Sequence, residues 1–266
     1  TADISIACWN YYCLTRDGQW LRTKAFPLMK AVADFWVSRV TRNDDGSYSI
    51  CNVVGADEYA NGVDDNAFTN GAAIRALEYA CEAARICNEP VPEIWEEVGK
   101  GIRILRFKDG VTREHATYNG EMIKQADVNL LGYPLYFVGD AESQKKDMEY
   151  YVDKIDPQNG PAMSYSVFCV QYARMGDAKR AYEMFCRCYQ PNLRAPFGVL
   201  AETPTSDNPY FMTGAGGLLQ AVINGFCGLQ IMDGGVEQLS SVLPAHWKKV
   251  TVKGVGPEKK MYVRER

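Results

Sequence analysis

Residues 55–70 read Gly-Ala-Asp-Glu-Tyr-Ala-Asn-Gly-Val-Asp-Asp-Asn-Ala-Phe-Thr-Asn. Gly55, Asn61 and Gly62 favour tight turns, and a helix is predicted to begin near Asn66. Segments with helical spacing of apolar residues lie on both sides, and a link between two helices needs only a few residues. A loop this long and acidic is therefore either a solvated cap, with Asp64 or Asp65 at the helix N-terminus, or a functional loop.

The order of these residues resembles the acid loop of glycoside hydrolase family 65, which contains α-glucoside phosphorylases and a branch of hydrolases. In that family the Glu of an Asp-Glu-Tyr triplet is the general acid, and the resemblance assigns this role to Glu58. It also places Asp57 beside the substrate. The family pattern has Pro at the place of Ala56 and often His at the place of Ala60, and neither departure changes the proton donor.

Composition and charge exclude several classes of protein. At 266 residues, with 47% hydrophobic and 23% charged residues, the chain is long enough to bury one large core. A net charge of −4 gives no reason to expect a nucleic acid or an acidic membrane surface as partner. No apolar run reaches the length that spans a bilayer. We therefore expect neither nucleic-acid nor membrane binding.

The nine cysteines are scattered, and only His115 and His246 are available to join them as metal ligands. No Cys-x-x-Cys or Cys/His spacing typical of a metal site occurs. We expect most of the thiols to be small core residues, no metal and no cofactor. An odd number of cysteines fits a reducing, cytoplasmic compartment better than an oxidising one.

Apolar spacing predicts a chain of helices joined by short turns. The short extended segment 48–50 leads to the acid loop, residues 108–128 and 190–217 are expected to be irregular, and residues 250–255 alternate as a strand does. The predicted helices cover residues 3–15, 19–40, 66–88, 91–107, 129–137, 141–154, 162–175, 178–188 and 215–227.

The run Ile123-Lys124-Gln125-Ala126-Asp127-Val128 resembles a second motif of the same family. There the Lys and Gln bind the hydroxyl groups of the glucosyl unit, and an ammonium beside an amide suits such hydroxyls. Taken alone, Lys124 and Gln125 would more often be a surface pair. The resemblance makes them candidates for substrate binding.

A third segment bears on the reaction type. Cleavage with inversion needs either a second carboxylate to activate water or a pocket for phosphate. The resemblance assigns the base of a hydrolase to Glu202, which lies upstream of Thr213-Gly214-Ala215-Gly216-Gly217, and it places Thr213 and Gly214 at the substrate. The family's phosphorylases carry a His in this loop, and residues 190–217 contain none. Glu202 as a solvated loop acid, and phosphate bound at the helix that follows, stay open as alternatives.

Helix pairs with polar residues in their connections predict an all-α fold. The family resemblance implies a partial (α/α)6 toroid over residues 1–245, the last two-thirds of the catalytic barrel, and a truncated β segment over residues 246–266. Because Thr1 falls inside a helical pattern, we expect a piece of a longer enzyme that lacks the family's upstream Trp-Asp segment. Helix faces left open in such a piece would favour self-association.

The sequence as a whole predicts inverting hydrolysis of α-glucosidic bonds in a glucose-containing disaccharide or oligosaccharide. Inverting phosphorolysis of an α-glucoside is the first alternative. A helical scaffold or sugar-binding remnant without catalysis is the second. A scaffold has no need to bring Glu58 and Glu202 to one place beside Lys124 and Gln125, so the geometry discriminates between these classes.

Overall fold

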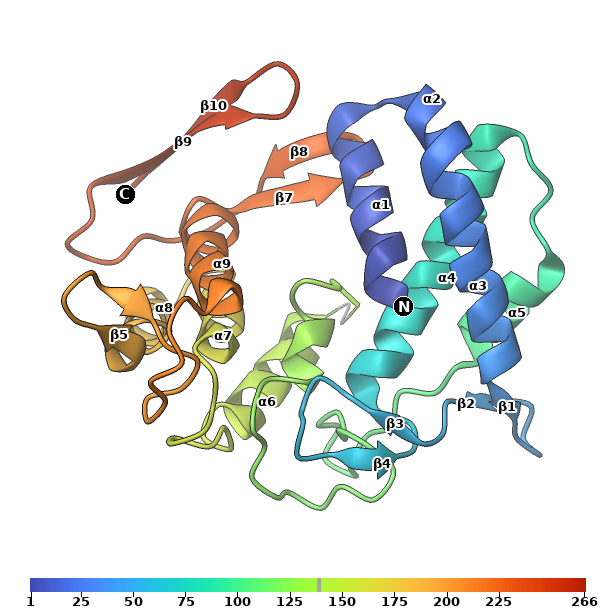
Figure 1. The fold of residues 1–266 in the computed structure, drawn as a ribbon, viewed down its shortest axis with the longest axis horizontal. Helices are drawn as coiled ribbons and strands as arrows, with labels where there is room; N and C mark the ends of the chain where they lie inside the picture. The colour runs from blue at the N-terminus through green and yellow to red at the C-terminus, as the bar shows by residue number, and fades with distance from the viewer. Residues whose placement is uncertain (138–139) are drawn as a thin grey trace. The chain divides into compact units, whose positions relative to one another are not determined.

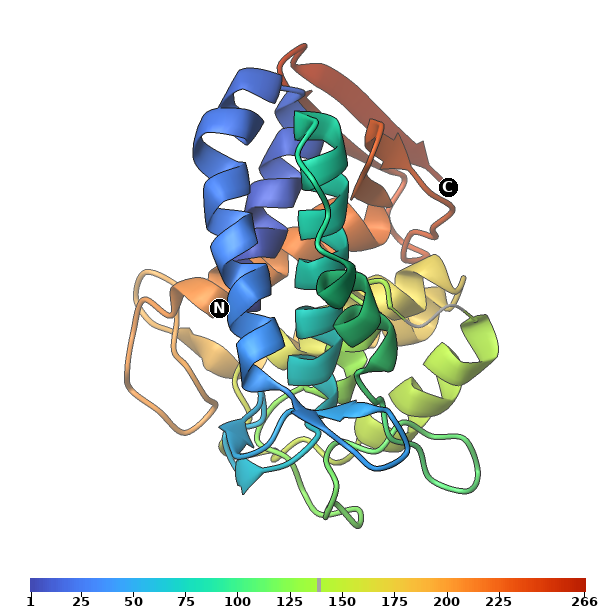
Figure 2. The ribbon, with the colours of Figure 1, turned by 90° about the vertical axis from the view of Figure 1, so that its right-hand side faces the viewer.

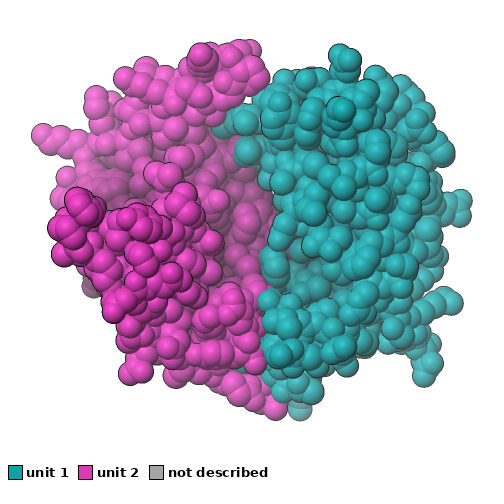
Figure 3. All heavy atoms as spheres, viewed as in Figure 1, with its two compact units in different colours: residues 1–55, 60–118, 231–236 teal, residues 56–59, 119–230, 237–266 magenta. Residues whose placement is uncertain are grey.

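The computed structural model describes residues 1–137 and 140–266, and the chain folds into two compact units. Unit 1 consists of residues 1–55, 60–118 and 231–236 (Figure 3). Unit 2 consists of residues 56–59, 119–230 and 237–266. Helices make up most of the regular structure of both units, and the strands are short.

Unit 1 is a bundle built around α4 (Ala67–Cys87), which packs against α1 (Ala2–Thr15), α3 (Phe26–Arg39) and α5 (Glu93–Gly101). The helices α1, α3 and α4 run side by side in both ribbon views (Figures 1 and 2). A short helix α2 (Gly18–Trp20) and a π-helical turn η1 (Leu21–Ala25) lead into α3. Two hairpins complete the unit: β1 (Thr41–Arg42) with β2 (Tyr48–Ser49), and β3 (Val53–Val54) with β4 (Asn61–Val63).

The sequence of α4 explains why this helix forms the centre of unit 1. Its N-cap is Asn66, whose side-chain oxygen accepts a hydrogen bond from the Thr69 N–H at 2.8 Å. The helix ends at Asn88, which adopts a left-handed backbone conformation with φ 58°. Small buried residues let neighbouring helices approach closely. They are Ala67, Gly71, Ala72, Ala73, Ala76, Ala80, Ala83 and Ala84.

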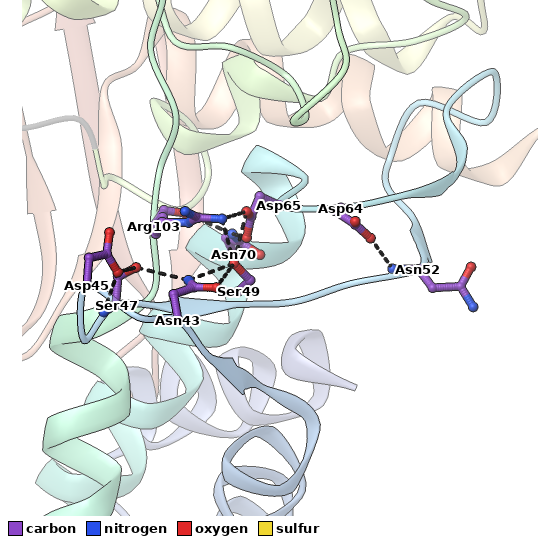
Figure 4. Close-up of polar contacts among 9 residues, drawn as sticks. All are labelled: Asn43, Asp45, Ser47, Ser49, Asn52, Asp64, Asp65, Asn70 and Arg103. Carbon is purple, nitrogen blue, oxygen red and sulfur yellow. Dashed lines mark hydrogen bonds and ion pairs between the residues drawn. The ribbon is translucent and has the colours of Figure 1, made fainter.

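A buried polar network lies immediately before α4 (Figure 4). Asp65 is almost fully buried, and its carboxylate accepts hydrogen bonds from Arg103 Nη2 at 2.5 Å and from Ser49 Oγ at 3.1 Å. Asn70 on α4 donates to Asp65 Oδ1 and to the Arg103 carbonyl. A buried carboxylate needs such partners, because leaving it unpaired would cost several kcal/mol. The network therefore supports the start of the helix from within unit 1.

Unit 2 is organised around α7 (Met163–Arg174), in which all ten residues from Ser164 to Ala173 are buried. It packs against α8 (Ala178–Arg187), α9 (Met212–Gln220) and the π-helical turn η4 (Ala221–Phe226) that continues α9. The helix α6 (Ala141–Tyr151) packs against the 3-10 turn η2 (Val128–Leu131). Asp140 and Asp177 cap α6 and α8 through their side chains.

Short strands complete unit 2 and its connections. A 3-10 turn η3 (Gln190–Asn192) leads to the hairpin of β5 (Leu193–Arg194) and β6 (Val199–Leu200), in which Leu193 pairs with Leu200. The longest hairpin, β9 (Lys249–Val255) with β10 (Lys260–Glu265), is antiparallel and follows near the C-terminus. A further hairpin consists of β7 (Leu229–Met232) and β8 (Gly235–Gln238). Its residues 231–236 belong to unit 1 and its two ends belong to unit 2.

Most of the predicted helices are confirmed, and three predictions need correction. Residues 129–137 form only the 3-10 turn η2, because Gly132 and Pro134 interrupt the segment and proline has no N–H to donate. The helix predicted for residues 91–107 ends at Gly101, where Ile102 turns to an extended conformation. The last helix begins at Met212 rather than near residue 215, and the expected loop before it contains the β5–β6 hairpin.

The nine cysteines are all free thiols, and six of them are buried. Burial raises the pKa of the Cys13 thiol to about 11 and that of Cys188 to about 12, so both are inert at neutral pH. This confirms the expectation that most are core residues. Within the described parts of the chain, none of the helices is both long enough and apolar enough to cross a bilayer.

Candidate active site

Three segments of unit 2 bring the predicted site residues together: the acid segment 56–59, the segment 123–127, and the loop 202–208, which we call the base loop. Lys124 Nζ lies 2.5 Å from Glu58 Oε2 and 3.7 Å from Glu202 Oε1. The two carboxylate oxygens are therefore within about 6.2 Å of each other, the limit reached when Nζ lies on the line between them. Two acids and an ammonium group thus converge on one place.

The three side chains differ in exposure, and both carboxylates are more accessible to solvent than the lysine. Lys124 is largely buried, with 18% of its side chain exposed, whereas Glu58 is 58% and Glu202 33% exposed. The pKa of Lys124 is raised, first by its hydrogen bond to Glu58 and further by the charge of both glutamates. Lys124 is therefore a cation at neutral pH, and the two carboxylates remain accessible to a ligand.

The acid segment is held by main-chain hydrogen bonds to two buried aspartates. Asp127 Oδ2 accepts from the N–H groups of Ala56 at 2.9 Å and Asp57 at 3.3 Å. Asp57 Oδ1 in turn accepts from the N–H of Lys124 at 2.7 Å and of Tyr59 at 3.2 Å. These reciprocal contacts join the acid segment to the segment that carries Lys124, and they fix the backbone at Glu58 and Lys124 together.

Tyr59 provides a third anchor for the acid segment. Its hydroxyl donates to Asp156 Oδ2 at 2.8 Å, and this bond raises the pKa of Tyr59. The pKa of Asp156 is held well below its usual range, mainly by hydrogen bonds from the main chain and side chain of Asn159. Asp156 therefore stays ionised and remains a strong acceptor for Tyr59.

The other predicted site residues occupy different surroundings. Asp57 is almost fully buried and contacts main-chain groups, so its observed contacts hold Lys124 in place. Gln125 has a buried side-chain oxygen without a partner among the described residues. Thr213 is exposed in the first turn of α9, and Gly214 is buried where a Cβ would come within 3.1 Å of the Ala162 methyl group. The roles of these residues in binding substrate remain predictions.

Several supporting residues were not singled out from the sequence. Asp127 belongs to the run 123–128, but its contact with the acid segment joins residues about seventy positions apart in the chain. Tyr59 and Asp156 are farther apart still. A buried aspartate that accepts main-chain hydrogen bonds leaves no periodic signal, so only the run around Lys124 could have pointed to Asp127.

The arrangement suits acid–base cleavage of a glycosidic bond. A pair of carboxylates on either side of such a bond serves hydrolysis, and a fixed ammonium group binds sugar hydroxyls or negative charge. Helical units that carry two carboxylates and an ammonium group on their connections define an all-α class of domain with a candidate acid–base site. The comparisons with known proteins agree with this class.

Residues 1–106 match the model of the glycosyl hydrolase family 65 central catalytic domain. The chain is 50% identical over 263 residues to a kojibiose hydrolase of Mucilaginibacter mallensis, covering 99% of this chain and 39% of that protein. It is 38% identical over 244 residues to a protein-glucosylgalactosylhydroxylysine glucosidase of Dictyostelium discoideum, covering 89% of this chain and 34% of that protein. The chain belongs to glycoside hydrolase family 65.

A solved structure supports the fold. The chain "Putative kojibiose phosphorylase from human microbiome" superposes with a TM-score of 0.74 at 17% identity, covering 98% of this chain and 44% of that one. At this identity the likeness concerns the fold alone. The chain spans about two fifths of the length of the curated kojibiose hydrolases that it matches.

Proposed function

We propose that the protein hydrolyses α-glucosidic bonds in a glucose-containing disaccharide or oligosaccharide with inversion at the anomeric carbon. The observation that carries this proposal is the convergence of Glu58 and Glu202 on Lys124. A scaffold or sugar-binding remnant has no need of two acids at one ammonium group. The names of the relatives, a kojibiose hydrolase and a protein-glucosylgalactosylhydroxylysine glucosidase, point the same way.

In the proposed reaction, Glu58 is the acid and Glu202 is the base. The Glu58 carboxyl group gives its proton to the glycosidic oxygen as the bond between this oxygen and the anomeric carbon breaks. Glu202 takes a proton from water as the water oxygen bonds to the same carbon from the opposite face. The products are β-glucose and an aglycone with a free hydroxyl group, and solvent returns the two carboxyl groups to their starting protonation states.

The ion pair between Lys124 and Glu58 must break when a substrate binds productively. A general acid donates a proton, whereas Glu58 here accepts a hydrogen bond from Lys124. Productive binding therefore requires Lys124 to leave Glu58 and bind the glucosyl hydroxyls instead, with Gln125 beside it. Substrate binding would thus prepare the acid by removing its cationic partner.

Several finer features belong to the same proposal. We infer that the helices over residues 1–245 form part of an (α/α)6 toroid, which the structural neighbour's fold supports. Residues 246–266, with the β9–β10 hairpin, would begin a separate β segment. Thr213 and Gly214 would contact the substrate. Exposed apolar side chains, among them Leu193, Tyr210, Met212 and Leu219, would favour self-association of the chain.

The proposal is tested by incubating the full-length protein, of which residues 1–266 form all or part, with α-linked glucose disaccharides in the presence and absence of phosphate. Hydrolysis predicts free glucose as the glucosyl product at a rate that phosphate does not raise. Accumulation of glucose 1-phosphate would favour phosphorolysis. No cleavage of any α-linked disaccharide would favour the scaffold.

Replacing Lys124 with alanine is expected to lower kcat/KM by about 10- to 100-fold, because the glucosyl unit loses a charge-assisted hydrogen bond. The thermal unfolding midpoint should change little, since the partner Glu58 is exposed and does not become a buried unpaired charge. A matched control is Lys145→Ala on α6, whose side chain is 63% exposed. Equal loss of stability and activity in Lys124→Ala would contradict a role in substrate binding.

A further inference from the structure

The base loop, residues 202–208, has few hydrogen bonds of its own. The Glu202 N–H donates to the Asn208 carbonyl at 3.3 Å, and the Ser206 N–H donates to the Thr203 carbonyl at the same distance. Both of these main-chain bonds are long. A further bond within the loop, from the Asn208 N–H to Ser206 Oγ, measures 3.0 Å. The loop carries one of the two carboxylates of the site, so its conformation must be supported from outside.

That support comes from the guanidinium group of Arg194, at the end of β5. Its Nη2 atom lies within hydrogen-bonding distance of three carbonyl oxygens of the base loop: Thr203 at 3.2 Å, Pro204 at 2.7 Å and Ser206 at 2.8 Å. Its Nη1 atom donates to the carbonyls of Pro191 and Leu193 at 3.0 and 3.1 Å. One side chain thus joins the base loop to the turn η3 and to the start of β5.

Asn192 supports the loop at its start. This residue is almost fully buried, and its Nδ2 donates to the carbonyls of Ala201 at 3.1 Å and Glu202 at 3.0 Å. The Glu202 carbonyl also accepts from the Ala162 N–H, immediately before α7. The backbone at Glu202 is therefore fixed by Asn192 and Ala162. The rest of the loop is held by the three Arg194 contacts and by one hydrogen bond from Thr205 Oγ1 to the Gln158 carbonyl at 3.1 Å.

We propose that Arg194 is a positioning residue that holds the base loop in the conformation in which Glu202 reaches the reacting water; this inference rests on the proposed function. Arginine suits the task because its planar group carries five N–H donors in a fixed arrangement. Lysine has its donors on one nitrogen, so it cannot reach at once the carbonyls that Nη1 contacts and those that Nη2 contacts. The substitution Arg194→Lys would therefore keep the charge and lose the support.

Loss of this support should act on the chemical step more than on binding. Lys124 and Gln125 lie on another segment and would still hold the glucosyl unit. A displacement of the base by about 1 Å is enough to lower a rate about 100-fold. Arg194→Ala and Arg194→Lys are therefore expected to lower kcat by about that factor, with KM changed little.

Chemical rescue separates positioning from general destabilisation. The Arg194 side chain is 25% exposed, so a small cation can reach the space that Arg194→Ala opens. Millimolar guanidinium chloride should restore kcat of Arg194→Ala with saturation, and should leave Arg194→Lys, where the space stays filled, unchanged. Sodium chloride at equal ionic strength controls for salt. Arg180→Ala, an exposed arginine on α8, should have normal activity and no response to guanidinium.

Amide hydrogen exchange gives a readout that does not depend on activity. Residues 203–208 should exchange faster in Arg194→Ala than in the wild type, and guanidinium should restore their protection, while α7 stays unchanged.

Normal kcat in either Arg194 variant would overturn the proposal. So would a loss of kcat that guanidinium does not repair, together with unchanged exchange in the loop. If Arg194→Ala does not fold, the kcat of Arg194→Lys and the amide exchange of its residues 203–208 test the proposal instead. An active Glu202→Ala would instead overturn the proposed function, and the exchange result would stand apart from it.

Discussion

Glu58→Gln is expected to lower kcat on an α-linked glucose disaccharide by about 10²- to 10⁴-fold, the usual contribution of general acid catalysis. The amide keeps the size and hydrogen-bonding capacity of the side chain but has no proton to give to the departing oxygen. An aryl glucoside with an acidic leaving group needs no protonation, so its cleavage should fall far less. The measurement is kcat for both substrates in the full-length protein.

The contrast between the two substrates identifies the acid. Glu142→Gln on α6 is a suitable control, because Glu142 is an exposed glutamate whose ion pair is a surface contact with Lys146. An equal loss on both substrates would indicate that Glu58 holds the sugar or Lys124 rather than donating a proton. Normal turnover of the disaccharide by Glu58→Gln would show that another group is the acid.

The helical fold was predictable because the apolar spacing and the end signals of a helix lie within a short stretch of sequence. The apolar spacing in α4 and α8 follows one helical face, and each of these helices has a capping residue, Asn66 or Asp177, immediately before it. The segment 129–137 was mispredicted because Leu131, Tyr133 and Leu135 are buried without forming a helix, at the end of the 3-10 turn η2 and in the irregular residues after it. Burial without regular spacing cannot be told from a helix in the sequence alone.

The hairpin of β5 and β6 was missed for a related reason. Each of its strands has only two residues, too few for a period-two pattern to appear. Yet this hairpin carries Arg194 and leads into the base loop. The part of the fold that supports Glu202 therefore depends on hydrogen bonds from the side chains of Asn192 and Arg194 to main-chain carbonyls, which composition and periodicity do not record.

The candidate site was predictable only as separate pieces. The roles of Glu58, Lys124 and Glu202 follow from the family resemblance of three short runs, and residue chemistry alone left each with an ordinary surface alternative. Their convergence, with Lys124 between the two acids, is a property of the tertiary structure. The family resemblance also did not predict the contacts of Asp57, whose buried side chain accepts a hydrogen bond from the main chain of Lys124.

The second large effect is expected for Glu202→Ala, which should abolish hydrolysis of both the disaccharide and the aryl glucoside. Without a base, the attacking water cannot lose its proton, and a good leaving group does not replace that function. This distinguishes Glu202 from Glu58. Added azide needs no base and fits the vacated space, so it should restore slow cleavage of the aryl glucoside and yield β-glucosyl azide.

The stereochemistry of the wild-type reaction tests the same assignment. Inverting enzymes hold their carboxyl groups about 6.5–9.5 Å apart to admit a water, whereas retaining enzymes hold them about 5–5.5 Å apart. Lys124 now draws the nearest oxygens of Glu58 and Glu202 within about 6.2 Å, and substrate must displace it from Glu58 before water fits between substrate and base. The first product seen by NMR should therefore be β-glucose, before mutarotation. If α-glucose appears first, Glu202 acts as a nucleophile. If phosphate accelerates cleavage and glucose 1-phosphate forms, Glu202 is a bystander, and the anion replaces the activated water.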